Sequence, residues 1–166
     1  MKIVVTGSIA FDYLMSFPGK FTEHFLPEHM QRVSLSFLVD SMEKRRGGCA
    51  PNIAYTLALL GERPCLMATA GQDFGDYRAW LEAAGVDTSL VRQVPDKFTA
   101  SFFCSTDTDN NQIASFYTGA MANAAGSIER LSEIAAGGGQ LPTSQRDIAE
   151  ILDQPGDVLL VSECAG

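Results

Sequence analysis

The chain has 166 residues, of which 46% are hydrophobic and 19% are charged, and its mean hydropathy is +0.04. This composition is typical of a folded domain with one sizeable core, and it excludes a disordered or fibrous chain. Twenty acidic and 12 basic side chains give a formal charge of -8, and the resulting field repels nucleic acid and anionic membrane surfaces. We therefore expect no nucleic acid and no membrane among its partners.

The cysteines and the N-terminus indicate the compartment. The four cysteines, at positions 49, 65, 104 and 164, include no C-x-x-C pair, and only two histidines could join them as ligands. This spacing predicts no metal site and favours reduced thiols. The apolar run at 3–5 is too short for a signal peptide, and no run approaches the ~18 residues of a membrane span. We expect a cytoplasmic protein.

The first sixty residues contain two predicted strands and one predicted helix. Residues 2–6 form a β-branched run ended by a glycine, which is typical of a buried strand. Residues 33–40 alternate apolar and mostly polar side chains, which predicts a half-buried strand. A helix is expected over 51–60, because a proline suits its first turn and a glycine follows its end.

Three further elements are predicted before residue 122. We expect a strand at 65–70 and then a helix that Asp73 caps and that stops at Gly85. Two β-rich runs, 98–106 and 112–118, flank five Asp, Asn and Thr residues and predict a hairpin. This mixture predicts an α/β body with an antiparallel flap inserted into it.

The composition of the chain changes after residue 122. Helical stretches are expected at about 127–136 and 143–153, with three glycines at 137–139 as a flexible joint. A buried strand is predicted at 157–162, and no helix follows it before residue 166. Because a parallel strand normally leads into a crossover helix, we expect the chain to be part of a larger fold.

The first candidate site lies at the start of the predicted helix. Gly47 and Gly48 stand just before this start, where free backbone N–H groups can approach a polar ligand closely. Asn52 lies in the first turn, and its amide offers a donor and an acceptor to a pair of hydroxyls. A plain loop and helix start is the alternative interpretation. The neighbouring Cys49 is expected to be a buried side chain rather than a reactive thiol.

A carboxylate is predicted close to the end of the first strand. Asp12 follows strand 2–6 at the edge where open α/β sheets hold ligands, so it could accept two hydroxyls. The alternative is a loop aspartate that satisfies a local turn. Glu163 follows strand 157–162 with similar geometry and is assigned a structural role.

Two aromatic residues suggest the other end of the same ligand. Phe102 and Phe116 lie on opposite arms of the predicted hairpin, where they could sandwich a flat ring, although hairpin phenylalanines are also common in cores. With Asp12 and Asn52 holding hydroxyls, such a ligand would be a nucleoside. Neither a Walker A sequence nor G-x-G-x-x-G occurs, so the usual nucleotide-binding loops are absent from the sequence.

The glycine-rich segment also carries a family resemblance. Residues 47–54, followed after six residues by Gly61 and after nine more by Gly71, resemble the first signature of the PfkB-type, ribokinase-like sugar and nucleoside kinases. The segments 6–10, 17–21, 34–40 and 112–117 are similar to the bacterial adenosine kinase branch. The similarity runs from about residue 2 to residue 122.

The resemblance implies an α/β fold, a ribokinase-like sheet flanked by helices with a small antiparallel β lid, here truncated. Residues 1–122 would be the acceptor-binding part, with lid strands at about 13–17, 33–40 and 98–118. Residues 123–166 would be a divergent helical stretch and a final strand. Family members are about twice as long, and the C-terminal half that binds ATP and Mg²⁺ and holds the catalytic residues is expected to lie outside this chain.

The resemblance also implies roles for individual residues. Ribose hydroxyls would be bound by Asp12, Gly48 and Asn52. The base and ribose would be framed by Ser8, Ser36, Phe102 and Phe116. The lid would mediate homodimer contacts.

The implied function is phosphoryl transfer from ATP to the ribose 5'-hydroxyl of adenosine or another nucleoside or sugar, with this chain supplying the acceptor-binding half. Two alternatives stay open at this stage. One is a non-enzymatic module that binds nucleosides or sugars. The other is a non-functional fragment that needs a partner chain to fold.

Overall fold

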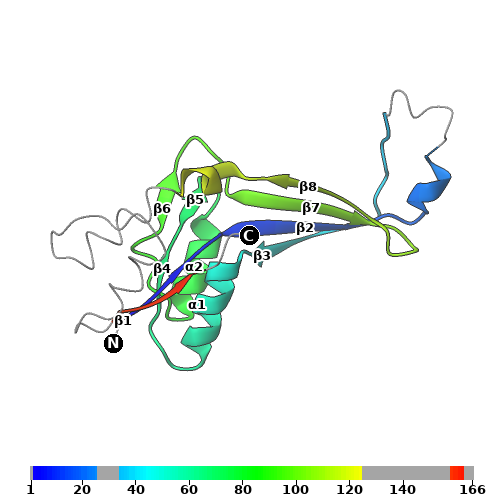
Figure 1. The fold of residues 1–166 in the computed structure, drawn as a ribbon. Helices are drawn as coiled ribbons and strands as arrows, with labels where there is room; N and C mark the ends of the chain where they lie inside the picture. Colours follow the sequence, from blue (N-terminus) through cyan, green and yellow to red (C-terminus); the bar gives the residue numbers. More distant parts are fainter. Residues whose placement is uncertain (1, 26–33, 125–157, 163–166) are drawn as a thin grey trace.

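The structure, a computed structural model, describes residues 2–25, 34–124 and 158–162. Within these ranges the chain forms three sheets and two α-helices (Figure 1). The helical stretches predicted at 127–136 and 143–153, the glycines at 137–139 and Glu163 lie outside the described residues.

A parallel sheet in the order β4-β1-β9 forms part of what we call the body, together with the two α-helices. Its strands are β1 (Lys2–Thr6), β4 (Cys65–Met67) and β9 (Val158–Ser162). On β1, Ile3, Val4 and Val5 are at most 5% exposed, and burying one such side chain contributes about 1.5–3 kcal/mol. The predictions of a buried strand at 2–6 and of a strand at 157–162 are confirmed.

The single strand predicted at 65–70 is wrong in its continuity. The chain forms β4, passes Ala68, and then forms β5 (Thr69–Gly71) in a different sheet. β5 pairs in parallel with β6 (Arg92–Val94), and the N–H of Arg92 donates to the carbonyl of Ala68 at 2.9 Å. The apolar run therefore serves two sheets, and a sequence pattern does not show where one ladder stops.

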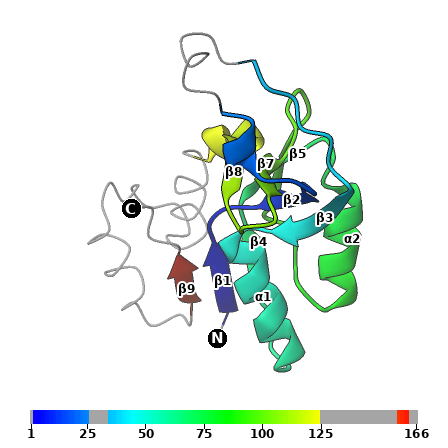
Figure 2. The ribbon, with the colours of Figure 1, turned by 90° about the vertical axis from the view of Figure 1, so that its right-hand side faces the viewer.

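Two helices pack beside each other next to the parallel sheet (Figure 2). They are α1 (Cys49–Leu59) and α2 (Gly75–Ala83), and each ends two residues before a glycine, as predicted. The rings of Tyr55 on α1 and Trp80 on α2 stack with their centroids 4.1 Å apart. In the described ranges no helix is long and apolar enough to cross a membrane.

The prediction that Asp73 caps α2 is wrong. The N-cap position is occupied by Phe74, and no side chain bonds to the start of this helix. The Oδ1 atom of Asp73 instead accepts hydrogen bonds from the backbone N–H of Thr99, at 2.8 Å, and from its hydroxyl, at 2.7 Å. Thr99 is fully buried, so its polar groups need partners, and Asp73 satisfies two of them.

A second sheet of four strands projects from the body, and we call it the lid sheet (Figure 1). In the order β3-β2-β7-β8 its strands are β3 (Ser41–Gly47), β2 (Ala10–Ser16), β7 (Ala100–Thr106) and β8 (Gln112–Tyr117). The antiparallel pairing of β7 and β8 confirms the predicted hairpin. The lid sheet is mixed rather than wholly antiparallel, because β2 and β7 pair in parallel.

The strand predicted at 33–40 is wrong. Within this stretch residues 34–40 are irregular, and the strand that pairs with β2 in antiparallel orientation is β3, which begins at Ser41. Of the alternating apolar residues in the irregular stretch, Phe37 packs against Phe17 and Phe21, whereas Leu35 is 38% exposed. The apolar alternation therefore marks an aromatic contact and not a strand.

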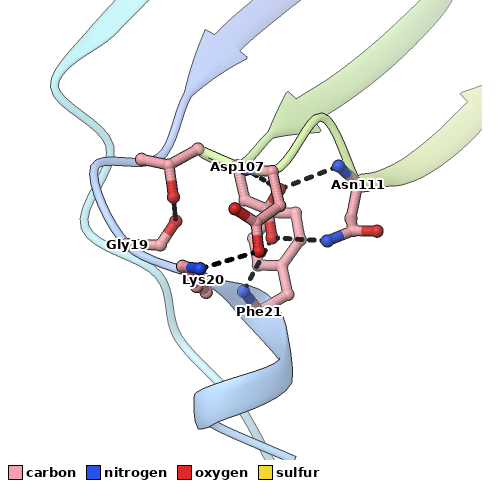
Figure 3. A network of polar contacts seen from close by, with 7 residues as sticks. Gly19, Lys20, Phe21, Asp107 and Asn111 are labelled. Atoms are coloured by element: carbon pink, nitrogen blue, oxygen red, sulfur yellow. Dashed lines mark hydrogen bonds and ion pairs between the residues drawn. The ribbon is translucent and has the colours of Figure 1, made fainter.

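The far end of the lid sheet is held together by Asp107, which lies in the turn between β7 and β8 (Figure 3). Its Oδ2 accepts the backbone N–H of Phe21, at 2.9 Å, and the side-chain amide of Asn111, at 3.0 Å. Its Oδ1 accepts the backbone N–H groups of Asp109 and Asn111. The bond from Phe21 ties the turn to the short 3-10 helix η1 (Phe21–Glu23), and the other three hold the turn itself. An ion pair between Lys20 and Asp109 adds a second link between these segments. A second 3-10 helix, η3 (Gly119–Asn123), follows β8.

Candidate functional site

Asp12 lies near the root of the lid sheet, within β2 rather than in the loop that the sequence predicts. The neighbouring strand β3 ends at Gly47, which stands opposite Ala10 in the register. A Cβ atom on Gly47 would overlap Oδ2 of Asp12, so the half-buried carboxylate lies directly against the Gly47 backbone. This close approach needs a residue without a side chain at position 47.

Gly48 joins the lid sheet to the start of α1. It is the N-cap residue of α1 and has φ +93°, a conformation that residues with a side chain rarely adopt. A Cβ here would overlap the carbonyl oxygen of Ser8 and lie 2.8 Å from Cα of Ile9. The next N–H, that of Cys49, donates to the Ser8 hydroxyl at 3.3 Å. Ser8, Asp12 and the two glycines therefore form one contiguous group.

Asn52 lies in the first turn of α1 and is exposed. Its backbone carbonyl accepts the hydroxyl of Thr56 at 2.8 Å, as helix geometry allows four residues later. Cys49, which the sequence predicts to be buried, is exposed at the start of the same helix. The start of α1 lies beside the root of the lid sheet (Figure 1), so the exposed Asn52 is presented there.

The two phenylalanines lie in one row with Asp12 across the lid sheet. The register places Asp12 opposite Phe102 on β7, and Phe102 opposite Phe116 on β8. Residues that are directly opposite in a ladder point to the same face, so all three side chains share one face of the lid sheet. Phe102 is half-buried and Phe116 is 52% exposed. The arrangement sets a carboxylate beside two aromatic rings.

Ser36 does not join this group in the structure. It precedes Phe37 in the irregular stretch, and the backbone N–H of Asp40 bonds to the carbonyl of Ser16 at the far end of β2. Asp12 lies four residues before Ser16 along the same strand, toward the body. Ser36 is therefore placed near the tip of the lid sheet, whereas Asp12 lies at its root.

Tyr77 lies on α2 and makes a polar contact that was not predicted from the sequence. The hydroxyl of this buried residue donates to the carbonyl of Gly47 at 3.0 Å. Burial raises the pKa of Tyr77 well above its usual range, the nearby Asp12 carboxylate raises it further, and Arg46 opposes both. The hydroxyl therefore stays protonated and acts as a donor. The one sequence signal for this contact is a tyrosine at a helical position, because a buried hydroxyl needs a hydrogen-bond partner.

The hydrogen bonds around Asp107 determine its ionisation. Burial by itself raises the pKa of this carboxyl, but the bonds from Asn111, from the backbone of Phe21 and from Asp109 outweigh it and lower the pKa to about 2. Asp107 is therefore ionised at every ordinary pH. It stabilises the tip of the lid sheet and lies away from Asp12.

No three His, Cys, Asp or Glu side chains converge at a possible metal site among the described residues. The residues present there do not fit a magnesium site. The chemistry that the group around Asp12 offers is recognition of hydroxyls and of a flat ring.

The chain matches a known family over most of its length. Residues 2–137 match the pfkB family of carbohydrate kinases, which is more than half of the 166 residues. The chain therefore belongs to the pfkB carbohydrate kinase family, and its α/β fold is ribokinase-like.

Three relatives illustrate the similarity. The nucleoside kinase of Methanothermobacter thermautotrophicus is 32% identical over 120 residues, which make up 71% of this chain and 36% of the relative. The nucleoside kinase of Burkholderia thailandensis, solved in complex with inosine, has a TM-score of 0.59 at 43% identity. The match covers 73% of this chain and 38% of the kinase chain. The ribokinase of Cryptococcus neoformans, solved in complex with ADP, has a TM-score of 0.60 at 25% identity. That match covers 72% of this chain and 35% of the ribokinase chain. The chain thus spans little more than a third of the length of these relatives.

Proposed function

We propose that the chain is the acceptor-binding part of an ATP-dependent nucleoside kinase and that its acceptor is adenosine. The observation that carries this proposal is the row of Asp12, Phe102 and Phe116 on one face of the lid sheet. A carboxylate suits hydroxyls and two aromatic rings suit a flat base, so the row matches the two ends of a nucleoside. A free sugar would use only the first of these features.

At the ribose end, the Asp12 carboxylate accepts hydrogen bonds from the ribose hydroxyls. The N–H of Gly48 and the side-chain amide of Asn52 add polar contacts from the start of α1. A hydrogen bond to a charged group is worth about 1.5–3 kcal/mol, so Asp12 carries the largest single share of ribose recognition.

At the base end, Phe102 and Phe116 pack against the purine. Stacking of a base on an aromatic side chain is worth about 1–3 kcal/mol. Phe116 is more than half exposed, which leaves its ring accessible to a ligand. Ser8 and Ser36 complete the proposed contacts, with Ser36 reaching the ligand only if the tip segment approaches the root.

The reaction proposed for the whole protein uses ATP as phosphoryl donor, with Mg²⁺, and the ribose 5'-hydroxyl as acceptor. Support comes from the family and from relatives whose structures contain inosine or ADP. The residues described here hold and orient the acceptor. Such a reaction suits a cytoplasmic protein.

Calorimetric titration of the chain with adenosine, inosine and ribose tests the proposal. We expect adenosine to bind at least about tenfold more tightly than ribose, because ribose has no ring to stack. Asp12→Ala should weaken both ligands, whereas Asp96→Ala, which removes an exposed carboxylate elsewhere, should leave them unchanged. Equal affinity for adenosine and ribose would contradict a nucleoside acceptor. Tight binding without phosphorylation in the presence of ATP would favour a non-enzymatic binding module.

We also propose that a second copy of the chain covers the other face of the lid sheet. On that face four large apolar side chains are 38–63% exposed, namely Met42, Phe103, Ile113 and Tyr117, and the exposed Lys44, Arg46 and Ser115 lie among them. Exposed apolar patches of this kind mark interaction surfaces. In sedimentation experiments, Ile113→Asp should lower the dimer fraction. Leu59→Asp, which changes an exposed apolar residue at the end of α1, should not.

A further inference from the structure

Tyr77 links the body to the root of the lid sheet. Its side chain is fully buried, and its ring lies 5.5 Å from Phe11 on β2 and 5.8 Å from Trp80 on α2, measured between centroids. Its hydroxyl reaches the carbonyl of Gly47, thirty residues earlier in the chain, at 3.0 Å. One hydroxyl on α2 thus holds the last residue of β3.

Gly47 lies between Tyr77 and Asp12. On one side its carbonyl accepts the tyrosine hydroxyl, and on the other its Cα lies against the Asp12 carboxylate, where a Cβ would overlap Oδ2. The peptide between Gly47 and Gly48 is planar and trans, so the N–H of Gly48 points in the direction opposite to the held carbonyl. Holding this carbonyl therefore also fixes the direction of the Gly48 N–H.

The two glycines make such a restraint necessary. Gly48 has φ +93°, and adjacent glycines allow the peptide between them many orientations. A fixed hydroxyl on a packed helix selects one of these orientations without blocking the space that the Asp12 carboxylate occupies. The hydroxyl is a buried donor whose bond to Gly47 is not exposed to competition from water.

We propose that Tyr77 is a positioning residue of the acceptor site. Its hydroxyl orients the peptide between Gly47 and Gly48 and thereby sets where the Asp12 carboxylate and the Gly48 N–H meet the acceptor hydroxyls. This inference rests on the proposed function, since it assigns Tyr77 to the same site.

The first test compares Tyr77→Phe with Tyr55→Phe. The second variant removes a hydroxyl from the same aromatic cluster but leaves the hydrogen bond to the Gly47 carbonyl in place. Each variant is titrated with adenosine and with 2',3'-dideoxyadenosine, which lacks the two ribose hydroxyls. Tyr77→Phe should weaken adenosine by about tenfold, the equivalent of one net hydrogen bond, and dideoxyadenosine by less than about twofold. Tyr55→Phe should change neither affinity.

The ratio of the two affinities does not depend on how much of a sample is folded, so a loss of stability alone cannot produce this result. Equal weakening of both nucleosides, or weakening of neither, would overturn the proposal.

A second measurement on the ligand-free chain separates this inference from the proposed function. In nuclear magnetic resonance spectra, Tyr77→Phe should move the Gly47 carbonyl, the Gly48 amide and the Asp12 carboxyl resonances, and Tyr55→Phe should not. If the chain did not bind adenosine but these three resonances moved, the proposed function would fail and the positioning role of Tyr77 would stand. An unchanged Asp12 resonance in Tyr77→Phe would contradict the positioning role whatever the ligand.

Discussion

Gly47→Ala is expected to reduce nucleoside affinity while leaving most of the stability intact. The three atoms nearest to a Cβ at this position all belong to the Asp12 side chain, and the backbone of Gly47 does not have a positive φ. Alanine therefore fits the backbone, and the half-buried carboxylate must rotate away. The acceptor then loses a hydrogen bond to a charged group, about 1.5–3 kcal/mol, which is roughly a tenfold to 150-fold rise in Kd for adenosine.

Gly48→Ala is the matched control for this substitution. Here the obstacles are backbone atoms of Ser8 and Ile9, and alanine would have to adopt φ +93°. Such a conformation costs about 1–3 kcal/mol, so this variant should lose stability first. Urea denaturation and adenosine titration of both variants measure the two effects. Wild-type affinity in a folded Gly47→Ala chain would refute the assignment of the Asp12 carboxylate to the acceptor site.

Three further outcomes are expected. Asp12→Ala should weaken adenosine and ribose by the same factor of about ten or more in titrations, since the lost contact is to the hydroxyls that both share. Phe116→Ala should weaken adenosine binding by about 1–3 kcal/mol and leave ribose binding unchanged. Because Phe116 is 52% exposed, the free energy of unfolding of this variant should fall by less than it does when a core phenylalanine is replaced, about 3–5 kcal/mol. The native pKa of Asp107 lies below its ordinary value of 3.8, so its contribution to stability is complete above about pH 4 and is lost as the pH falls to about 2. Acid titration of the unfolding midpoint should show this loss in the wild type and not in Asp107→Asn.

Local sequence signals were sufficient for several elements. The β-branched run at 2–6 gave the first strand, and the five residues at 107–111 gave the hairpin turn, because their side chains bond to nearby backbone N–H groups. The helix predicted at 51–60, from a proline in its first turn and a glycine after its end, is α1, which begins two residues earlier, at Cys49. In each case the signal and its cause lie within a few residues.

The elements that the sequence misplaces depend on distant contacts. β3 contains Glu43 and Lys44 and is exposed along nearly its whole length, so it has no apolar pattern of its own. It forms a strand because it pairs with β2. The ammonium group of Lys44 lies 3.7 Å from the ring centroid of Phe11, a contact that a charged run does not reveal. The bond from Tyr77 to Gly47 likewise spans thirty residues, so no pattern along the chain could predict it.

The candidate site was predictable only in part, because its geometry also depends on contacts between residues far apart in the sequence. The glycine-rich segment and Asp12 were identified as chemistry-bearing residues, but their mutual contact depends on the register of β2 and β3. The row formed with Phe102 depends on the parallel pairing of β2 and β7, which joins segments ninety residues apart. Ser36 was grouped with this row by resemblance, and the structure places it near the tip of the lid sheet instead.

The most direct test of the central claim is a map of amide and side-chain resonances of the 166-residue chain as adenosine is added. We expect the largest changes at the root of the lid sheet, on Ser8, Asp12, Gly48, Asn52, Phe102 and Phe116. At a sub-saturating adenosine concentration, these changes should be smaller with Asp12→Ala than with the wild type. Changes confined to other parts of the folded chain, or none at saturating adenosine, would contradict a nucleoside acceptor site at this position.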